Sequence, residues 1–284
     1  MRRLLIRPGA IGDCILSLPA LRHLLAEYTE VWTRSALVPL MTFADAAHSI
    51  ASTGLDLAGV GDLEMPAGLR ARLQSFDSIV SWYGANRPEF REIMGRIGVP
   101  CEFHAALPPA GYTGHAIDFF AAQVGAPAGL IPRIDVPPAS VRPTIVIHPF
   151  SGSRRKNWSL ERYRELAARL PSEVEWTAGP EEELPAATRF ANLADLAAWI
   201  KGSRLFIGND SGITHLAAAT GVATLALFGP ASTETWTPRG ENVVVLRSSS
   251  LESLEVDDVL AAANRLLRSP LSSQSTAQPA FVLP

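Results

Sequence analysis

The sequence predicts an α/β protein made of two parallel-sheet domains, and three observations support this fold class. Short apolar runs alternate with helical patterns along most of the 284 residues. The alternation stops at a stretch rich in Pro, Gly and Ala, "APAGLIPRIDVPPASVRP", and then starts again. Polar motifs directly follow several of the apolar runs. Strands that alternate with helices are typical of parallel sheets covered on both faces. We therefore expect two Rossmann-like domains that face each other across a cleft.

The first predicted domain covers residues 1–138. It begins with the apolar run "RRLLIR" and a helical segment that ends near residue 28. Its last helix spans 115–125, where Gly125 can adopt the left-handed conformation of a helix cap. The other predicted strands are "EVWTR" (30–34), "DSIVSWYG" (77–84) and "CEFHAAL" (101–107).

The second predicted domain covers residues 139–268. Its strands are expected at 144–150, 174–179, 205–210, 224–229 and 242–248, and its helices at 160–170, 193–203, 212–221 and 256–268. The tail 269–284 is polar and contains prolines, so we expect it to be flexible. Ligands of open parallel sheets bind at the carboxyl ends of the strands, and the motifs below all follow a predicted strand.

Composition narrows the class of protein. A net charge of −3 argues against a nucleic-acid binder, which usually carries a strongly basic domain. The two cysteines are too few for a disulfide framework, which fits a reducing compartment. The N-terminal segment has only three apolar residues before Arg7, and no run approaches the roughly 18 apolar residues of a membrane span. We expect a cytoplasmic protein, with peripheral contact at the inner face of the plasma membrane left open.

The first turn, "RPGAIGDC" (7–14), is not a dinucleotide-binding fingerprint, because G-x-G-x-x-G is absent. Asp13 has two interpretations. It is the N-cap of a helix that starts at residue 14, or the helix starts at Ser17, with Pro19 in its first turn. In the second case Asp13 lies in the turn and points into the cleft, where its carboxylate could remove a proton from an attacking hydroxyl.

Two motifs of the second domain are suited to a diphosphate. After the strand at 144–150, Ser151, Gly152 and Ser153 precede "RRK", which ends in Lys156; small residues expose main-chain amides to an anion, and the cations neutralise it. The alternative is a solvated basic turn. The other motif is "NDSGITH", in which Asp210 ends a strand and Ser211 and Gly212 open a helix. The unpaired amides of a first helical turn favour phosphate.

Helical spacing places His215 on the same face as Ser211, and Ile213, Leu216 and Ala217 on the buried stripe. His215 is thus expected on the cleft side as a donor to phosphate or ribose oxygens. The alternative is a capped helix with an incidental histidine. A further strand is followed by "AGPEEELP", in which Glu182 or Glu183 could hold ribose hydroxyls. Three glutamates also suit the N-terminus of a helix, where the helix dipole favours them.

Taken together, these motifs resemble the heptosyltransferase-like glycosyltransferases of family 9, which have the GT-B fold. The resemblance rests on "RPGAIGD" at 7–13, "IVIHPFSGSRRKNWSLERYRELAARL" at 145–170 and "FIGNDSGITHLAAATGVATLALFGP" at 206–230. It implies an inverting, metal-independent transfer of heptose from ADP-heptose to a lipopolysaccharide-type acceptor. No cofactor is implied besides this nucleotide-sugar co-substrate, and no D-x-D pair of a metal-dependent enzyme occurs.

The resemblance also implies roles for individual residues. Asp13 matches the catalytic base, and Lys156 matches the cation that holds the donor phosphates. Asp210, Ser211, Gly212 and His215 match the diphosphate-binding segment. Ser151, Ser153 and Glu182, which the loop motifs themselves suggest, complete the expected donor site. No metal ligand is implied.

Residues 35–75 match nothing in the family, although the family's first domain recognises the acceptor. For a phosphorylated acceptor, the first predicted domain offers only scattered arginines, such as Arg87, Arg91 and Arg96. Alternatives are therefore a transferase with another donor or acceptor, a sugar-nucleotide epimerase, and a non-catalytic nucleotide-binding protein.

Overall fold

The structure is a computed structural model that describes residues 1–58, 65–230, 234–268 and 281–282, and the chain divides into two compact units. The first unit comprises Met1–Tyr112 and Ala116–Leu130, and the second comprises Thr113–His115 and Ile131–Pro284. We expected a domain boundary after residue 138; in the structure, residues 131–138 lie with the second unit. The expected flexible tail, 269–284, is outside the described residues except for Phe281–Val282.

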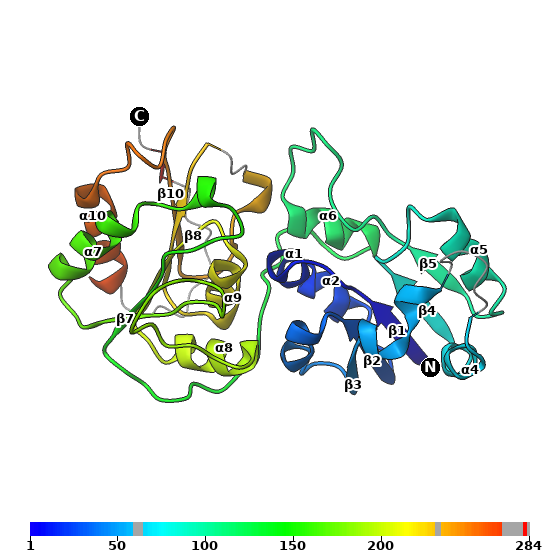
Figure 1. Cartoon of the computed structure of the whole chain (residues 1–284). Helices are drawn as coiled ribbons and strands as arrows, with labels where there is room; N and C mark the ends of the chain where they lie inside the picture. The colour runs from blue at the N-terminus through cyan, green and yellow to red at the C-terminus, as the bar shows by residue number, and fades with distance from the viewer. Residues whose placement is uncertain (59–64, 231–233, 269–280, 283–284) are drawn as a thin grey trace. The chain divides into compact units, whose positions relative to one another are not determined.

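The first unit is built on a five-stranded parallel sheet of order β3-β2-β1-β4-β5 (Figure 1). Its strands are β1 (Arg2–Ile6), β2 (Tyr28–Thr33), β3 (Ala46–Ser49), β4 (Ser78–Ser81) and β5 (Cys101–Phe103). Its helices are α1 (Ile11–Leu16), α2 (Leu18–His23), η1 (Ser35–Leu40), α3 (Ile50–Thr53), η2 (Leu55–Leu57), α4 (Ala67–Leu73), α5 (Pro88–Gly95) and α6 (Ala116–Gln123). The chain leaves β1 in one direction and returns on its other side at β4. This reversal makes the carboxyl ends of β1 and β4 the favoured ligand position.

The helix after the first turn differs from both interpretations of the sequence. It begins at Ile11 with Ala10 as its N-cap, so Asp13 is its third residue rather than its cap or a turn residue. The predicted single helix is divided into α1 and α2, which are separated by Ser17. Pro19 explains the break, because it lacks the amide that a continuous helix needs and instead occupies the first turn of α2.

The second unit is built on a six-stranded parallel sheet of order β11-β10-β9-β8-β6-β7. Its strands are β6 (Ile145–His148), β7 (Val174–Trp176), β8 (Leu205–Asn209), β9 (Thr224–Phe228), β10 (Val243–Arg247) and β11 (Phe281–Val282). Its helices are η3 (Arg154–Lys156), α7 (Leu160–Arg169), α8 (Leu193–Lys201), α9 (Gly212–Thr220), η4 (Glu234–Trp236) and α10 (Val256–Arg268). Here the order reverses between β6 and β8, whose carboxyl ends are therefore the favoured ligand position.

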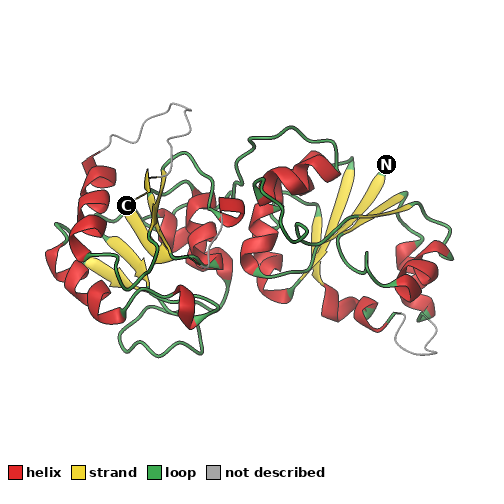
Figure 2. Ribbon diagram, turned by 90° about the horizontal axis from the view of Figure 1, so that it is seen from above, coloured by secondary structure: helices red, strands yellow, loops and turns green. Residues whose placement is uncertain are grey.

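Helices cover the faces of each sheet, as Figure 2 shows. Every residue of β6, β8 and β9 is buried, which explains why these strands are continuous apolar runs rather than alternating patterns. Among the described residues, no helix is long and apolar enough to cross a membrane.

Candidate functional site

The loop after β8 forms a capped helix N-terminus. Ser211 has an extended backbone, and its hydroxyl accepts a hydrogen bond from the amide of Thr214 at 3.3 Å. The hydroxyl of Thr214 in turn donates to the carbonyl of Asn209 at 2.5 Å, which fixes the helix to the end of the strand. The amides of Gly212 and Ile213 precede the first intrahelical hydrogen bond, so α9 offers an anion two donors at its positive end.

Lys156 joins the basic loop to this helix N-terminus. Its Nζ lies 2.8 Å from Oδ2 of Asp210, whose side chain is only 7% exposed. Arg154 and Arg155, which share η3 with Lys156, are exposed. The Lys156–Asp210 ion pair thus connects the loops that follow β6 and β8, two strands that are far apart in the sequence. A diphosphate on α9 would share that ammonium with Asp210.

Ser151 and Ser153 organise the loop between β6 and η3. The Ser151 hydroxyl lies 2.6 Å from Oδ1 of Asn157 and 2.8 Å from the carbonyl of Ser153, and it accepts a hydrogen bond from the Ser153 amide at 3.3 Å. Ser153 takes part through its main chain, and the residue is exposed. The structure therefore gives Ser151 a role in shaping the loop, and it places the Ser153 side chain at the surface.

His215 is buried, with 6% of the residue exposed. Burial lowers the pKa of its imidazole to about 4; His115 and Lys156 also lower it, and Asp210 opposes them. The ring is therefore uncharged at neutral pH and can serve a ligand as a hydrogen-bond donor rather than as a cation. The predicted buried stripe of α9 is confirmed for Leu216 and Ala217, whereas Ile213 is only half-buried. The buried surface is also wider than a stripe, since every residue from Thr214 to Thr220 is buried.

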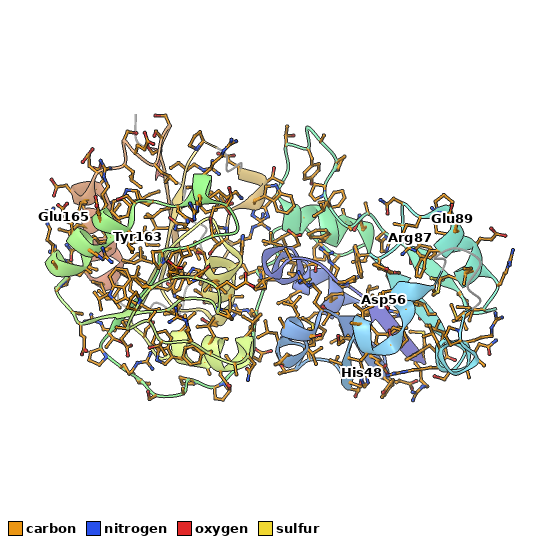
Figure 3. All side chains as sticks on the ribbon, in the orientation of Figure 1. His48, Asp56, Arg87, Glu89, Tyr163 and Glu165 are labelled. Carbon is orange, nitrogen blue, oxygen red and sulfur yellow. The ribbon has the colours of Figure 1, made fainter. Side chains whose placement is uncertain are left out.

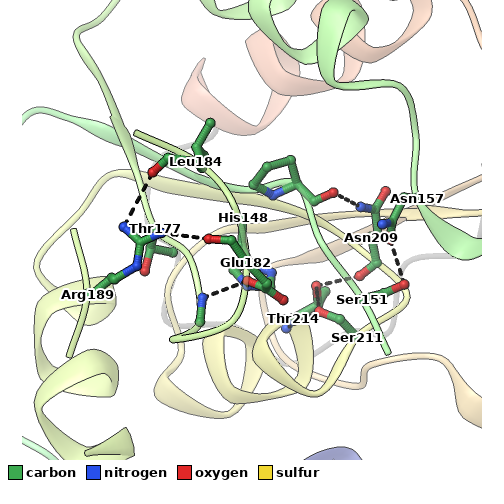
Figure 4. A network of polar contacts seen from close by, with 12 residues as sticks. His148, Ser151, Asn157, Thr177, Glu182, Leu184, Arg189, Asn209, Ser211 and Thr214 are labelled. Atoms are coloured by element: carbon green, nitrogen blue, oxygen red, sulfur yellow. Dashed lines mark hydrogen bonds and ion pairs between the residues drawn. The ribbon is translucent and has the colours of Figure 1, made fainter. Parts of the chain in front are cut away.

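Glu182 lies beside His148 at the ends of β7 and β6 (Figure 4). Its Oε2 lies 3.1 Å from Nε2 of His148 and accepts a hydrogen bond from the Gly179 amide at 2.6 Å. Although burial tends to raise the pKa of Glu182, the hydrogen bonds from His148 and Gly179 lower it overall, so the carboxylate is ionised. No helix starts at the three glutamates, and the alternative of a helix N-terminus is wrong. Glu183, the other candidate, is exposed.

Asn209 is a buried residue of the site that the sequence analysis missed. Its Oδ1 accepts hydrogen bonds from the Trp158 amide at 2.9 Å and the Tyr163 hydroxyl at 3.0 Å, and its Nδ2 donates to the carbonyl of Pro149 at 2.8 Å. Tyr163 is fully buried inside the second unit (Figure 3), and burial raises the pKa of its hydroxyl well above the usual range. The sequence contained a signal for Asn209, because it is the one polar residue of the strand "LFIGN" and lies at its carboxyl end.

In the first unit, Arg7 holds the start of helix α1, in which Asp13 is the third residue. Its guanidinium is 1% exposed and donates to the Ser17 hydroxyl at 3.0 Å and to the carbonyls of Pro8 and Asp13, both at 3.1 Å. It also lies 4.8 Å from the centre of the Phe120 ring. Arg7 thus organises the main chain of the turn, while the side chain of Asp13 is half-buried. The neighbouring Cys14 is a core residue, and burial raises the pKa of its thiol to about 11.

A cavity of about 340 Å³ lies in the second unit. Its lining residues are Thr113, Gly114, His115, Glu234, Thr237 and Arg247. The imidazole Nε2 of His115 lies 3.0 Å from the carbonyl of Thr237, which connects the segment 113–115 to η4. Within the described ranges, no group of three or more His, Cys, Asp or Glu side chains could hold a metal ion.

Part of the chain matches a known family model. Residues 123–261, which include all the candidate donor-site residues, match the model of glycosyltransferase family 9 (heptosyltransferase). Comparison with curated proteins finds no match.

Solved structures are similar over almost the whole chain. A family 9 glycosyltransferase from Veillonella parvula is 18% identical, with a TM-score of 0.73 and coverage of 94% of this chain and 97% of that one. The ADP-heptose lipopolysaccharide heptosyltransferase II of E. coli is 18% identical, with a TM-score of 0.72 and coverage of 94% and 98%. E. coli heptosyltransferase WaaC, solved with ADP, is 16% identical, with a TM-score of 0.66 and coverage of 94% and 100%. The chain therefore has the GT-B fold, carries a domain of glycosyltransferase family 9, and is a glycosyltransferase.

Proposed function

We propose that the protein transfers a heptose from ADP-heptose to a lipopolysaccharide-type or related glycan acceptor, with inversion at the anomeric carbon and without a metal ion or other cofactor. The observation that carries this proposal is the Lys156–Asp210 ion pair at the N-terminus of α9. It places a cation and unpaired helical amides together at the β6–β8 reversal, where an open parallel sheet binds its ligand.

The donor diphosphate is proposed to occupy the amides of Gly212 and Ile213. Lys156 then offsets the charge that develops as the nucleotide leaves, and neutral His215 donates a hydrogen bond to a phosphate oxygen. One well-aimed donor of this kind contributes about 3–4 kcal/mol to the stabilisation of a transition state. This charge stabilisation is the task that a metal ion performs in other transferases, which is why the proposal needs none.

Asp13 is proposed to be the base that removes the proton from the acceptor hydroxyl. The buried Arg7 donates hydrogen bonds to the carbonyls of Pro8 and Asp13 and to the Ser17 hydroxyl, so the start of α1 is rigid where the base is attached. Direct attack of that hydroxyl on the anomeric carbon inverts its configuration, because only one displacement occurs. The reaction requires the first unit to present Asp13 to the sugar held by the second.

The choice of donor and acceptor is supported by similar structures. One of them is a heptosyltransferase solved with ADP, and another is an ADP-heptose lipopolysaccharide heptosyltransferase. The proposal places the enzyme in the cytoplasm, at the inner face of the plasma membrane if its acceptor is a lipid. Both cysteines are free thiols, as expected in a reducing compartment.

A thermal-shift panel with ADP, UDP, GDP and ADP-heptose tests the donor assignment. A ligand that binds only the folded state raises the melting temperature, so we expect ADP and ADP-heptose to raise it and UDP and GDP to leave it unchanged. Stabilisation by UDP or GDP alone would mean that the donor carries a different base, while the diphosphate site would stand. No stabilisation by any nucleotide would contradict the proposed function.

A further inference from the structure

Within the residues that the structure describes, the His148 ring makes one polar contact, which is to Glu182. The residue is 4% exposed at the carboxyl end of β6. Its Nε2 lies 3.1 Å from Glu182, whereas its Nδ1 is buried and has no hydrogen-bond partner among the described residues. Burying a polar atom without a hydrogen-bond partner is unfavourable, because the atom loses its contact with water. The hydrogen bond between Nε2 and Glu182 is thus the interaction that offsets the cost of burying the imidazole.

The hydrogen-bond pattern defines the tautomer of the ring. An ionised carboxylate can only accept hydrogen bonds, so Nε2 of His148 carries the proton and donates it to Oε2 of Glu182. The same oxygen accepts the Gly179 amide at 2.6 Å. Both donors therefore meet one oxygen of Glu182, and Oε1 has no partner in the described part of the chain. The carboxylate is held in one orientation and still has an oxygen to offer.

The position of Glu182 fits a nucleotide that starts at α9. The loops after β7, β6 and β8 are neighbours at one edge of the sheet, because β6 pairs with both of the other strands. Strands are about 4.8 Å apart, so two strand spacings separate the end of β8 from the end of β7. A ribosyl diphosphate can cover that span, with its phosphates at Gly212 and its ribose toward Glu182. Figure 4 shows His148, Glu182, Ser211 and Thr214 in this one region.

We propose that His148 is a positioning residue, which orients Glu182 so that Oε1 accepts hydrogen bonds from the 2′- and 3′-hydroxyls of the donor ribose. This inference rests on the proposed function, since it assumes that a nucleoside diphosphate occupies the second unit. It assigns His148 no contact with the ligand. Its effect reaches the nucleotide only through Glu182.

The test measures the affinity of the full chain for ADP and for 2′,3′-dideoxy-ADP by calorimetry. In the wild-type protein we expect ADP to bind about tenfold more tightly, because hydrogen bonds to a charged acceptor are lost with the hydroxyls. His148→Asn is expected to abolish this preference, because its amide nitrogen corresponds to Nδ1 and does not reach Glu182. His148→Gln places its amide nitrogen near the position of Nε2 and is expected to restore most of the preference.

Controls separate positioning from general damage. A loss of folding would weaken both ligands equally, whereas the inference requires a change in their ratio. Glu183→Ala, at the exposed neighbour, should keep the wild-type ratio. Glu182→Ala should remove the preference, and adding His148→Asn to it should change nothing more.

Wild-type preference retained by His148→Asn would overturn the inference and leave the proposed function intact. A wild-type protein that binds neither nucleotide would instead overturn the proposed function, and the inference with it.

Discussion

The two units hold their candidate functional groups in different ways. In the first unit, Arg7 donates hydrogen bonds to two main-chain carbonyls and to a serine hydroxyl, so the scaffold acts on the main chain at the start of α1, where Asp13 lies. In the second unit, the candidate groups bond to one another: Lys156 to Asp210, and His148 to Glu182. A base needs a fixed position, whereas a site for an anion gains from charged groups that are already oriented.

This difference predicts which mutations affect activity, which affect stability and which affect both. In the first unit, chemistry and stability should depend on different residues, Asp13 and Arg7. In the second unit, one substitution should alter both ligand affinity and folding, because removing a partner takes a charged contact away from a largely buried group. The following predictions test this contrast, starting with the largest effect.

Asp13→Asn is expected to lower the transfer rate by about 10²–10⁴-fold, because the amide cannot accept the proton of the acceptor hydroxyl. ADP affinity and melting temperature should stay near wild-type values, since the hydrogen bond that Arg7 donates to the main-chain carbonyl of Asp13 does not depend on the substituted side chain. Steady-state kinetics and ADP calorimetry measure both effects. Asp56→Asn, at an exposed residue of the same unit, is the matched control. Normal turnover by Asp13→Asn would show that Asp13 is not the base.

Arg7→Met should destabilise the protein by about 2–4 kcal/mol, because three buried or half-buried acceptors lose their donor. Arg7→Lys should recover little of this, since one ammonium cannot reproduce the planar fork of a guanidinium. Denaturant unfolding measures the free energy. ADP affinity, which belongs to the second unit, should not change. An Arg7→Met protein as stable as wild type would remove the proposed scaffold of the first turn.

Lys156→Met is expected to weaken ADP binding by about 10–100-fold, through the loss of one charge-assisted contact with the diphosphate. It should also lower the melting temperature, because Asp210 is left buried without the partner 2.8 Å away. Arg155→Ala, at the exposed neighbouring cation, should have neither effect. Calorimetry and thermal unfolding of the two variants are the measurements. Weaker binding with unchanged stability would break the contrast between the units.

Lowering the pH should destabilise the second unit through His215. The pKa of its imidazole is about 4 in the folded protein, below the usual value of 6.5, so the folded state binds fewer protons than the unfolded chain. The stabilisation is complete above pH 6.5 and is lost progressively as the pH falls toward 4. Between pH 6.5 and 5 this amounts to about 1–2 kcal/mol. Unfolding of wild type and His215→Asn at pH 7 and 5 measures it, and an identical pH dependence of the two proteins would contradict the assignment.

The sequence predicts most of the second unit because its strands are buried on both faces. Runs such as "LFIGN" and "TLALF" are apolar throughout and end in turn residues, and the observed strands start and end within a few residues of the predicted ones. Residues 35–75 gave no pattern, since β3 is half-exposed along its length and its neighbours are 3₁₀ helices and very short α-helices. Such elements depend on tertiary contacts rather than on periodicity.

The sequence predicts individual residues of the candidate site but not which of them interact with one another. Lys156, Asp210 and Glu182 are identified because they follow predicted strands, and ligands of parallel sheets bind at the carboxyl ends of strands. Their partners depend on which strands are neighbours, and β6 lies between β7 and β8 only in the folded sheet. The same reason hides His148, which reads as one more residue of a strand. Arg7 is hidden because a charged residue beside a glycine-containing turn usually lies in solvent.

Acceptor-dependent release of ADP from ADP-heptose tests the central claim most directly. The reaction is run with excess EDTA, with and without a lipopolysaccharide core that lacks its heptose, and the anomeric configuration of the product is read by NMR. We expect ADP release only with the acceptor, at a rate that EDTA does not change, and a product of inverted configuration. ADP-heptose that is left intact with the acceptor, a retained configuration, or a reaction stopped by EDTA would contradict it.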